Sequence, residues 1–253
     1  MPRKARTKSN SGIYHIIMRG INRQTIFEDE EDYKKFIHTI QRFKEICEYK
    51  IYAYCLMGNH FHILLKEGTE PLETIMRRIC GCYVFWYNRK YERIGSLFQD
   101  RYKSEPIEEN EYLFNVIRYI FRNPIKAGIV NNVQNYKWTN YLDYIQGFNH
   151  TEIDFVLNII NTDREKAISG FIEYVNRNDD DKCLDIQDKR SITDDNARII
   201  IRTQCNVDHA IDIQKFTVDK RNIYLKDLKE RCGLSIRQIE RLTGISRGVI
   251  QRI

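Results

Sequence analysis

The stretch Ile51-Tyr52-Ala53-Tyr54-Cys55-Leu56-Met57-Gly58-Asn59-His60-Phe61-His62-Ile63-Leu64-Leu65 decides the fold of this chain of 253 residues. Residues 51–57 and 61–65 are short runs rich in β-branched and aromatic side chains, which is typical of strands. A turn between the two runs would join them as a β-hairpin. Residues two apart in a strand point to the same face, so His60 and His62 project together. The stretch predicts two paired strands with two imidazoles on one face of the sheet.

The residues on either side of this hairpin predict further strands and helices. The predicted elements are a strand at 13–19, a helix at 29–48, the two strands of the hairpin, a helix from Pro71 to about Tyr91, a strand at 101–105 stopped by Pro106, and a helix at 111–122. Asn123-Pro124 is expected to end the last helix, because the residue before a proline is pushed out of the α region. The order of the first six elements predicts an α+β, ferredoxin-like split βαβ fold, with helices packed on one antiparallel sheet.

The composition is that of a folded globular protein. Apolar residues make up 42% and charged residues 30% of the chain, which argues against a disordered protein. No run approaches the roughly 18 consecutive apolar residues of a membrane-spanning helix, and no apolar segment follows the basic N-terminus as in a secretory signal. Seven cysteines without repeated CxxC spacing are typical of reduced thiols. We therefore expect a cytoplasmic protein with no membrane partner.

Basic charge gathers at the two ends of the chain. Residues 1–10 carry four basic side chains and no acidic one, and residues 221–253 carry eight basic and three acidic side chains. Since the whole chain has a net charge of +6, the part between the ends is slightly negative. Basic ends on a nearly balanced body favour a polyanionic partner, which predicts association with nucleic acid and hence with the nucleoid. A mildly cationic surface without a specific partner is the alternative.

The sequence predicts three parts. Residues 1–150 hold the ferredoxin-like domain, residues 151–220 a helical connector with an acidic linker near 178–195, and residues 221–253 a helix-turn-helix. Ser235–Leu242 and Ser246–Ile253 are the two helices of the last part, and each serine is placed to cap its helix. In DNA-binding helix-turn-helix motifs the second helix enters the major groove. The residues that would reach the bases here are Arg247 and Gln251, with Arg252 nearer the phosphates. A helical hairpin that packs on the main body, or a dimer contact, is the alternative.

The two histidines of the hairpin indicate a metal site. Two neighbouring imidazoles suit a divalent cation better than apolar packing, although a single histidine in a strand is more often structural. A third ligand would come from the end of the helix at 111–122, where Tyr119 and Asn123 share one face. An amide oxygen at Asn123 is a donor that Mg²⁺ or Mn²⁺ accepts, although asparagine before proline is also an ordinary helix stop. Tyr119 would supply a nucleophile, in competition with Tyr83, Tyr87 and Tyr91 of another helix.

Several segments together resemble a known family. These are Tyr14-His15-Ile16-Ile17-Met18-Arg19-Gly20, the hairpin from Met57 to Leu65, Phe98-Gln99-Asp100-Arg101-Tyr102-Lys103-Ser104, Ile117-Arg118-Tyr119-Ile120-Phe121-Arg122-Asn123-Pro124-Ile125-Lys126-Ala127-Gly128, and Trp138-Thr139-Asn140-Tyr141. They resemble the single-tyrosine HUH transposases, and within them the branch of REP-associated tyrosine transposases, over roughly residues 10–147. The resemblance implies that His60 and His62 hold Mg²⁺ or Mn²⁺, that Tyr119 is the nucleophile, and that Asn123 is a third ligand.

The resemblance also implies an activity. Tyr119 would attack a phosphate of single-stranded, hairpin-associated DNA, and the reaction would leave a 5′-phosphotyrosine and a free 3′-hydroxyl. The enzyme would be an endonuclease and strand transferase, acting as a monomer or a homodimer. Two alternatives stay open at this point: a non-catalytic DNA-binding transcriptional regulator, and a nickase of the relaxase or replication-initiator kind.

Basic and polar residues outside the catalytic centre are predicted to contact DNA. The candidates are Arg3, Lys4, Arg6 and Lys8 of the N-terminal arm, Arg19, Asn22 and Arg23 at and after the end of the first strand, Arg101 and Lys103 of the predicted strand at 101–105, and Arg247, Gln251 and Arg252 near the C-terminus. The alternatives are a solvated tail for the arm and a polar turn for the residues after the first strand.

Overall fold

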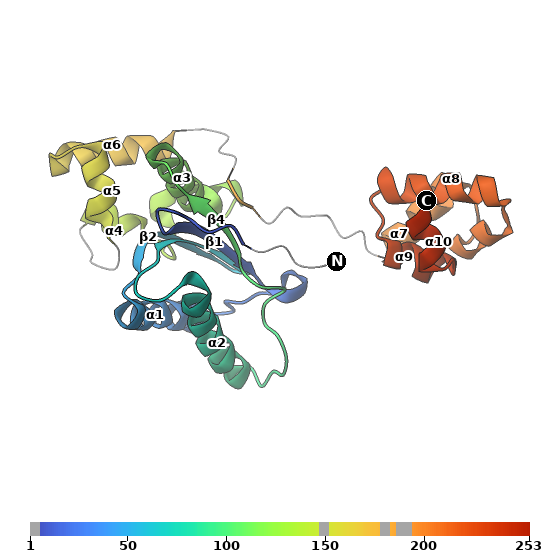
Figure 1. The fold of residues 1–253 in the computed structure, drawn as a ribbon, viewed down its shortest axis with the longest axis horizontal. Helices are drawn as coiled ribbons and strands as arrows, with labels where there is room; N and C mark the ends of the chain where they lie inside the picture. Colours follow the sequence, from blue (N-terminus) through green and yellow to red (C-terminus); the bar gives the residue numbers. More distant parts are fainter. Residues whose placement is uncertain (1–5, 147–151, 178–182, 186–193) are drawn as a thin grey trace. The chain divides into compact units, whose positions relative to one another are not determined.

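In the computed structural model, which describes residues 6–146, 152–177, 183–185 and 194–253, four strands form one antiparallel sheet (Figure 1). The strands are β1 (Ile13–Arg19), β2 (Lys50–Met57), β3 (His60–Lys66) and β4 (Lys103–Ile107). Their order across the sheet is β2-β3-β1-β4, so the two sequence-adjacent strands β2 and β3 pair as the predicted hairpin. This is the order of a split βαβ sheet, and the predicted α+β, ferredoxin-like fold class is confirmed.

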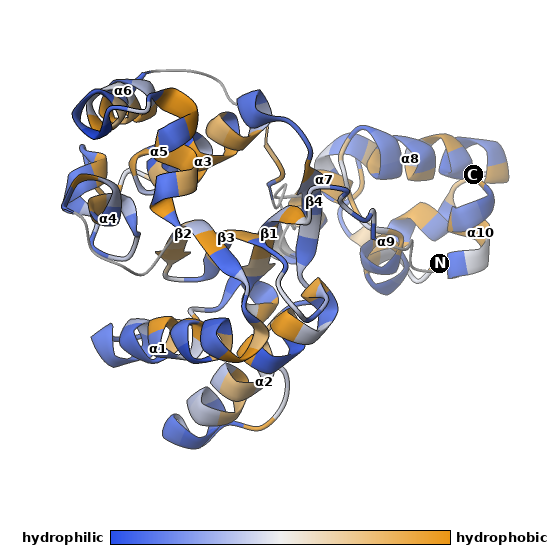
Figure 2. Ribbon diagram, turned by 60° about the vertical axis from the view of Figure 1, so that its left-hand side comes forward, coloured by the Kyte–Doolittle hydropathy of each residue, from blue (hydrophilic) through white to orange (hydrophobic). Residues whose placement is uncertain are grey.

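Helices cover both faces of this sheet. On one face lie α1 (Glu30–Cys47) and α2 (Leu72–Lys90), and on the other α3 (Asn110–Lys126), α4 (Tyr141–Gln146), α5 (Ile153–Ile160) and α6 (Arg164–Asn176). The helices carry apolar residues on one side and hydrophilic residues on the other (Figure 2). Strand β3 serves both layers: Phe61, Ile63 and Leu65 are buried in the core with α1 and α2, while Leu64 is buried in the core with α3. His62, which alternates with these residues, faces α3.

Helix α3 is longer than the sequence predicted. It continues through Pro124 to Lys126, so the expected end at Arg122 is wrong. Proline removes only its own N–H, and the helix resumes at once: the N–H of Ala127 donates to the carbonyl of Asn123 at 2.9 Å. Gly128, with φ of +70°, follows the helix in the left-handed conformation that commonly ends helices. As a result Tyr119 and Asn123 both lie inside a continuous helix.

Both edges of the sheet have features that a central strand would not tolerate. Pro106 lies inside β4 rather than before its end, which is possible because β4 is an edge strand and needs no second row of N–H donors. The opposite edge, β2, is covered by the Trp138–Tyr141 segment. The N–H of Leu56 donates to the carbonyl of Trp138 at 3.0 Å, and the Asn140 side chain accepts from the N–H of Tyr54 at 2.7 Å. This part of the family-like sequence thus protects an edge strand.

The chain divides into two compact units, Met1–Ile186 and Gln187–Ile253. This division differs from the boundaries expected after residues 150 and 220. Helices α5 and α6 bury Val156, Phe171 and other apolar side chains in the core that α3 forms, so they are part of the first unit. Among the described residues of either unit, none forms a helix both long and apolar enough to cross a membrane.

The second unit is entirely helical where it is described. It contains α7 (Asp194–Cys205), the 3-10 helix η3 (Ala210–Lys215), α8 (Val218–Glu230), α9 (Ile236–Thr243) and α10 (Arg247–Arg252), which share one core. Ser235 caps α9 as predicted, since its hydroxyl accepts from the N–H of Gln238 at 3.2 Å. Within the described residues, the side chain of Ser246 does not cap α10. The Glu240 carboxylate accepts from the N–H of Arg247 at 2.9 Å instead. Because α9 and α10 share their core with α7, η3 and α8, the residues from Ser235 onward do not form a core of their own.

Candidate active site

Two histidines of β3 lie together on the face of the sheet that α3 covers. The ring centroids of His60 and His62 are 5.2 Å apart, and their planes are nearly perpendicular. His62 is completely buried, whereas His60 is partly exposed, and its Nδ1 lies 2.6 Å from the side-chain oxygen of Asn59. The alternation of side chains along a strand, which predicted this pair, thus holds in the structure.

Tyr119 packs directly on the buried histidine. Its ring centroid is 5.6 Å from that of His62 and 6.0 Å from that of His15, in edge-to-face arrangements. The residue is only 5% exposed, and the ammonium of Lys126 lies 4.7 Å from its ring centroid. Burial raises the pKa of the Tyr119 phenol above its ordinary value, the carboxylate of Asp185 raises it further, and a hydrogen bond with Asn123 opposes these effects. The phenol is therefore protonated at neutral pH in this state.

The other tyrosines weighed from the sequence lie elsewhere. Tyr83 and Tyr87 belong to α2 and Tyr91 directly follows it, on the opposite face of the sheet. Their hydroxyls have structural partners: that of Tyr83 donates to the carbonyl of Ile26, and that of Tyr91 donates to Asp32 at 2.9 Å. The geometry therefore groups only Tyr119 with the two histidines among these four tyrosines.

Asn123 lies one turn after Tyr119 and contacts it. Its side-chain N–H donates to the backbone carbonyl of Tyr119 at 3.0 Å, so its amide oxygen is the atom that would bind a cation. Within the described segments, there is no group of three or more His, Cys, Asp and Glu side chains that could hold a metal ion. A site here would consist of two imidazoles and one amide.

One atom of His62 supports a metal at this position. Its Nδ1 lies 3.1 Å from Nε2 of His15, but its own Nε2 is buried and has no hydrogen-bond partner among the described residues. A buried polar atom without a partner is costly and is rarely left so without a function. An imidazole nitrogen in this state is a ready ligand for a divalent cation, so the residues present fit the Mg²⁺ or Mn²⁺ expected from the sequence.

Three residues that contact these groups were not predicted from the sequence. They are His15 of β1, Glu105 of β4 and Asp185 of the short described segment after α6. The signal for His15 was present, since it is a polar residue that alternates with Ile13 and Ile17 on one face of a strand. Asp185 lies beyond the segments that resemble the family, and nothing in its local sequence marks it.

The residues predicted to contact DNA differ in their position relative to His60 and His62. Arg19 pairs with His60 across the β1–β3 ladder, and Lys103 lies on the same face of β4 as Glu105 and is exposed. Arg101, Asn22 and Arg23 are also exposed. The sheet register thus places Arg19 directly beside His60, whereas Ile17 of β1 separates Lys103 from His62.

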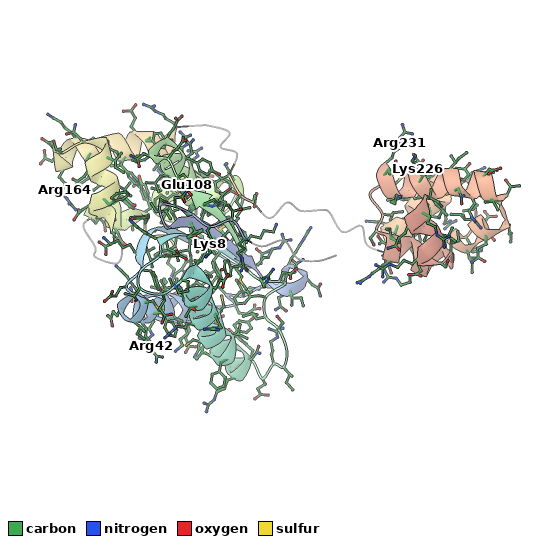
Figure 3. All side chains as sticks on the ribbon, in the orientation of Figure 1. Lys8, Arg42, Glu108, Arg164, Lys226 and Arg231 are labelled. Atoms are coloured by element: carbon green, nitrogen blue, oxygen red, sulfur yellow. The ribbon has the colours of Figure 1, made fainter. Side chains whose placement is uncertain are left out.

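The arm and the C-terminal candidates are arranged differently. Arg3 and Lys4 lie outside the described residues, and Lys8 is exposed (Figure 3). Arg6 is held by Tyr102: its guanidinium donates to the carbonyl of that residue at 3.1 Å and lies 3.7 Å from the centroid of its ring. Arg247, Gln251 and Arg252 of α10, in the second unit, are all exposed.

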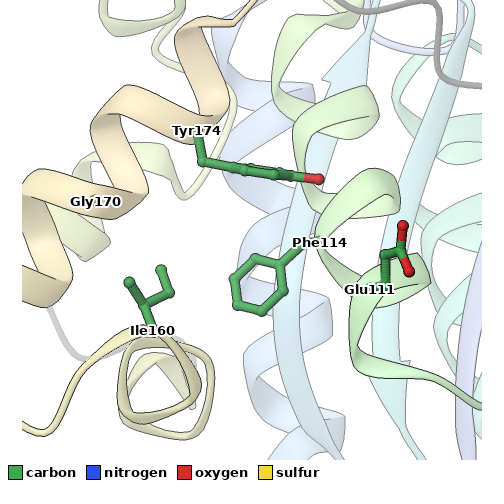
Figure 4. A pocket seen from close by; sticks show the side chains of 5 residues that line it. All are labelled: Glu111, Phe114, Ile160, Gly170 and Tyr174. Atoms are coloured by element: carbon green, nitrogen blue, oxygen red, sulfur yellow. The ribbon is translucent and has the colours of Figure 1, made fainter.

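A cavity of about 270 Å³ lies elsewhere in the first unit, between α3, α5 and α6. Figure 4 shows its lining residues, which are Glu111, Phe114, Ile160, Gly170 and Tyr174. Its lining is mostly apolar and includes none of the histidines, nor Tyr119. The cavity is therefore separate from the candidate active site.

The four-stranded sheet, with two histidines on one strand and a tyrosine on the facing helix, has the fold of the HUH transposases. Residues 8–123 match the family of IS200-like transposases. The resemblance to REP-associated tyrosine transposases is also confirmed.

Two relatives illustrate the similarity. A protein of Haemophilus influenzae that is assigned to the REP-associated tyrosine transposases is 26% identical over 113 residues, which cover 39% of this chain and 64% of the relative. The chain thus matches less than two thirds of that relative's length. A solved REP-associated tyrosine transposase bound to a REP hairpin has the same fold, with a TM-score of 0.50 and 20% identity, over 58% of this chain and 87% of the other. IS200-like transposases are enzymes, and the residues that match this family lie in the first unit.

Proposed function

We propose that the first unit is a metal-dependent endonuclease and strand transferase that cleaves single-stranded, hairpin-associated DNA through a 5′-phosphotyrosine intermediate. The observation that carries the proposal is the contact of the Tyr119 ring with His62, whose buried Nε2 has no partner among the described residues. Nucleophile and candidate ligand are thus already neighbours.

The residues would divide the chemistry as follows. His60, His62 and Asn123 would hold a divalent cation, Mg²⁺ or Mn²⁺, which when bound supplies Lewis-acid polarisation of the scissile phosphate. The phenolic oxygen of Tyr119 would attack phosphorus, forming a P–O bond as the bond to the 3′ oxygen breaks. The products are a 5′-phosphotyrosine and a 3′-hydroxyl. Because the energy of the broken bond is kept in the phosphotyrosine ester, the 3′-hydroxyl of the same or another end can attack that ester and release the tyrosine without ATP.

The surroundings of Tyr119 decide when it can react. Phenol is protonated at neutral pH, and burial together with the Asp185 carboxylate holds the proton more tightly. The Lys126 ammonium near the ring and the hydrogen bond with Asn123 favour the phenolate that develops during attack. We therefore expect the reactive state to be one in which Asp185 has moved away from the phenol.

The substrate class follows from the shape and charge of the sheet face. A phosphate must reach side chains that lie between a sheet and a helix, which favours a flexible single strand over a duplex. Arg19 and Lys103 lie on the same side of the sheet as His62 and would hold the backbone of such a strand. The solved relative is described as bound to a REP hairpin, which supports hairpin DNA as the partner.

The second unit is proposed to bind duplex DNA. Helices α9 and α10 are joined through Gly244, and α10 exposes Arg247, Gln251 and Arg252. A separate basic module with its own core is also what a non-catalytic DNA-binding regulator would need, and this observation supports that alternative.

Deletion of residues 187–253 should reduce duplex affinity more than hairpin cleavage. An equal loss of both would refute a separate role for the module.

A covalent-trapping experiment tests the proposal. Protein, Mn²⁺ and a labelled hairpin oligonucleotide should give an adduct that survives denaturation. Tyr119→Phe should abolish the adduct, and His60→Ala or His62→Ala should weaken its dependence on the metal, while DNA binding persists in all three. Tyr91→Phe is the matched control and should form the adduct normally, because Tyr91 lies on the other face of the sheet. Binding without any adduct in the wild type would favour the regulator.

A further inference from the structure

A chain of three side chains crosses the sheet from its edge to the candidate metal ligand. The carboxylate of Glu105 lies 2.8 Å from Nδ1 of His15, and Nε2 of His15 lies 3.1 Å from Nδ1 of His62. Both imidazoles are completely buried, and their rings are stacked with centroids 5.3 Å apart. The chain ends at Nε2 of His62, the buried atom without a partner among the described residues.

The register of the sheet builds this chain. Glu105 is directly opposite His15 on the β1–β4 ladder, and Leu64 is directly opposite His15 on the β1–β3 ladder. His62 precedes Leu64 by two residues and therefore lies on the same face of the sheet, diagonal to His15. Three strands thus contribute one residue each, and none of the three side chains can turn away without leaving a buried polar atom unpaired.

The order of donors and acceptors along the chain has one consistent solution when both rings are neutral. An ionised carboxylate only accepts hydrogen bonds, so Nδ1 of His15 carries the proton that it donates to Glu105. Nε2 of His15 then has a lone pair and accepts from the Nδ1–H of His62. His62 is consequently held as the tautomer whose Nε2 has a free lone pair, which is the form that binds a metal ion.

Glu105 is itself fixed in place. The same carboxylate oxygen that faces His15 also accepts from the backbone N–H of Leu184 at 2.9 Å, and the hydroxyl of Tyr112 bonds to the carboxylate. These bonds and His15 lower the pKa of Glu105, against the effect of burial, so the group is ionised at neutral pH. The carboxylate is therefore an acceptor held from several sides.

We infer that Glu105 and His15 are positioning residues for the metal site: they fix the ring orientation and the tautomer of His62 so that its Nε2 binds the divalent cation. Partners of this kind, which hydrogen-bond to a ligating histidine from behind, raise its basicity and typically change metal affinity by about 10- to 100-fold when removed. The inference rests on the proposed function in so far as it takes His62 as a metal ligand.

Titration of the full-length protein with Mn²⁺, followed by calorimetry or by the EPR signal of the free ion, measures the effect. His15→Leu and Glu105→Leu should each weaken Mn²⁺ binding by about 10- to 100-fold. Glu105→Gln should restore binding to within about threefold of the wild type, because its amide oxygen can still accept from His15 and Leu184. Glu108→Leu is the matched control. The Glu108 carboxylate accepts from the backbone N–H groups of Asn10 and Ser11 and makes no hydrogen bond with Glu105, His15 or His62 in the part of the chain that the structure describes, so Mn²⁺ affinity should not change.

Nitrogen NMR of the histidine side chains provides a readout that needs no metal. In the metal-free wild type, His62 should be protonated at Nδ1 and not at Nε2, and this preference should be lost in His15→Leu. A wild-type His62 protonated at Nε2 would overturn the inference even if the leucine variants failed to fold. So would equal Mn²⁺ affinity of the wild type and the folded leucine variants. Absence of Mn²⁺ binding by the wild type would instead refute the metal site itself, and with it the proposed function.

Discussion

Asp143 of α4 is a buried carboxylate whose removal should stabilise the first unit at neutral pH. The residue is 6% exposed, and its Oδ2 has no hydrogen-bond partner in the described part of the chain. Burial raises the pKa of Asp143 from 3.8 to about 6. The folded state therefore binds this proton more tightly than the unfolded state, and ionisation opposes folding.

The sign and size of the effect follow from the two pKa values. As the pH rises, the unfolded chain releases the proton first and the folded protein only near pH 6, so Asp143 lowers the free energy of unfolding across this range. The full loss is about 3 kcal/mol, of which about 2 kcal/mol falls between pH 4.5 and pH 8. Asp143→Asn cannot ionise. The difference in unfolding free energy, variant minus wild type, should thus increase by about 2 kcal/mol over that interval.

Urea denaturation at several pH values measures this difference. Both tryptophans, Trp86 and Trp138, lie in the first unit, so their fluorescence reports the unfolding of that unit alone. A constant offset between variant and wild type would reflect the new amide and does not affect the test, which depends on the slope with pH. Asp154→Asn is the control, because this carboxylate is exposed and paired with Arg164 at the surface. A difference that is flat from pH 4.5 to pH 8 for Asp143→Asn would refute the reasoning.

Three further predictions concern other parts of the chain. Asn140→Ala removes two bonds to the backbone of β2, at 2.7 and 3.2 Å, and should destabilise the first unit by about 2–3 kcal/mol in the same urea assay. Asp185→Asn removes a carboxylate that hydrogen-bonds to the Tyr119 phenol and whose negative charge would repel a phosphate. The variant protein should therefore form the covalent DNA adduct several-fold faster than the wild type. A slower reaction would identify the Asp185 carboxylate as the proton acceptor. Gly244→Ala places a Cβ against the Gln214 side chain, at a residue with φ of +72°. Gly233 has a similar φ but open space around it, so Gly233→Ala should cost only the roughly 1–2 kcal/mol of the left-handed conformation. Hydrogen exchange should show that Gly244→Ala lowers the stability of the second unit by more than Gly233→Ala does.

The parts of the fold that the sequence predicted are those set by local periodicity. The hairpin around His60, the alternation that places His62 with it, and the helix that carries Tyr119 all follow from spacings of two, three or four residues. The wrong predictions concern ends and boundaries. Helix α3 runs through Pro124, and Pro106 lies within β4, because a missing N–H is tolerated where neighbouring bonds or an edge position compensate.

Residues that act through long-range pairing could not be predicted in this way. Glu105 meets His15 across 90 positions of sequence, and His15 meets His62 across 47. These contacts depend on the register of three strands, which no local pattern in a single sequence specifies. The same holds for α5 and α6, whose apolar faces give helices but not the unit against which they pack. Only the assembled core shows that they belong with α3.

The strand that carries the site also explains why the site can be rigid. Phe61, Ile63 and Leu65 are completely buried in the core with α1 and α2, so β3 cannot slide by one residue without moving these side chains to the other face. The same restraint fixes His62 on the face of α3, opposite Tyr119. The contact between Tyr119 and His62, on which the proposed function depends, thus gains its precision from core packing on the far side of the sheet. Phe61→Ala should therefore weaken the proposed Mn²⁺ binding as well as stability, although the Phe61 side chain lies on the face opposite His60 and His62.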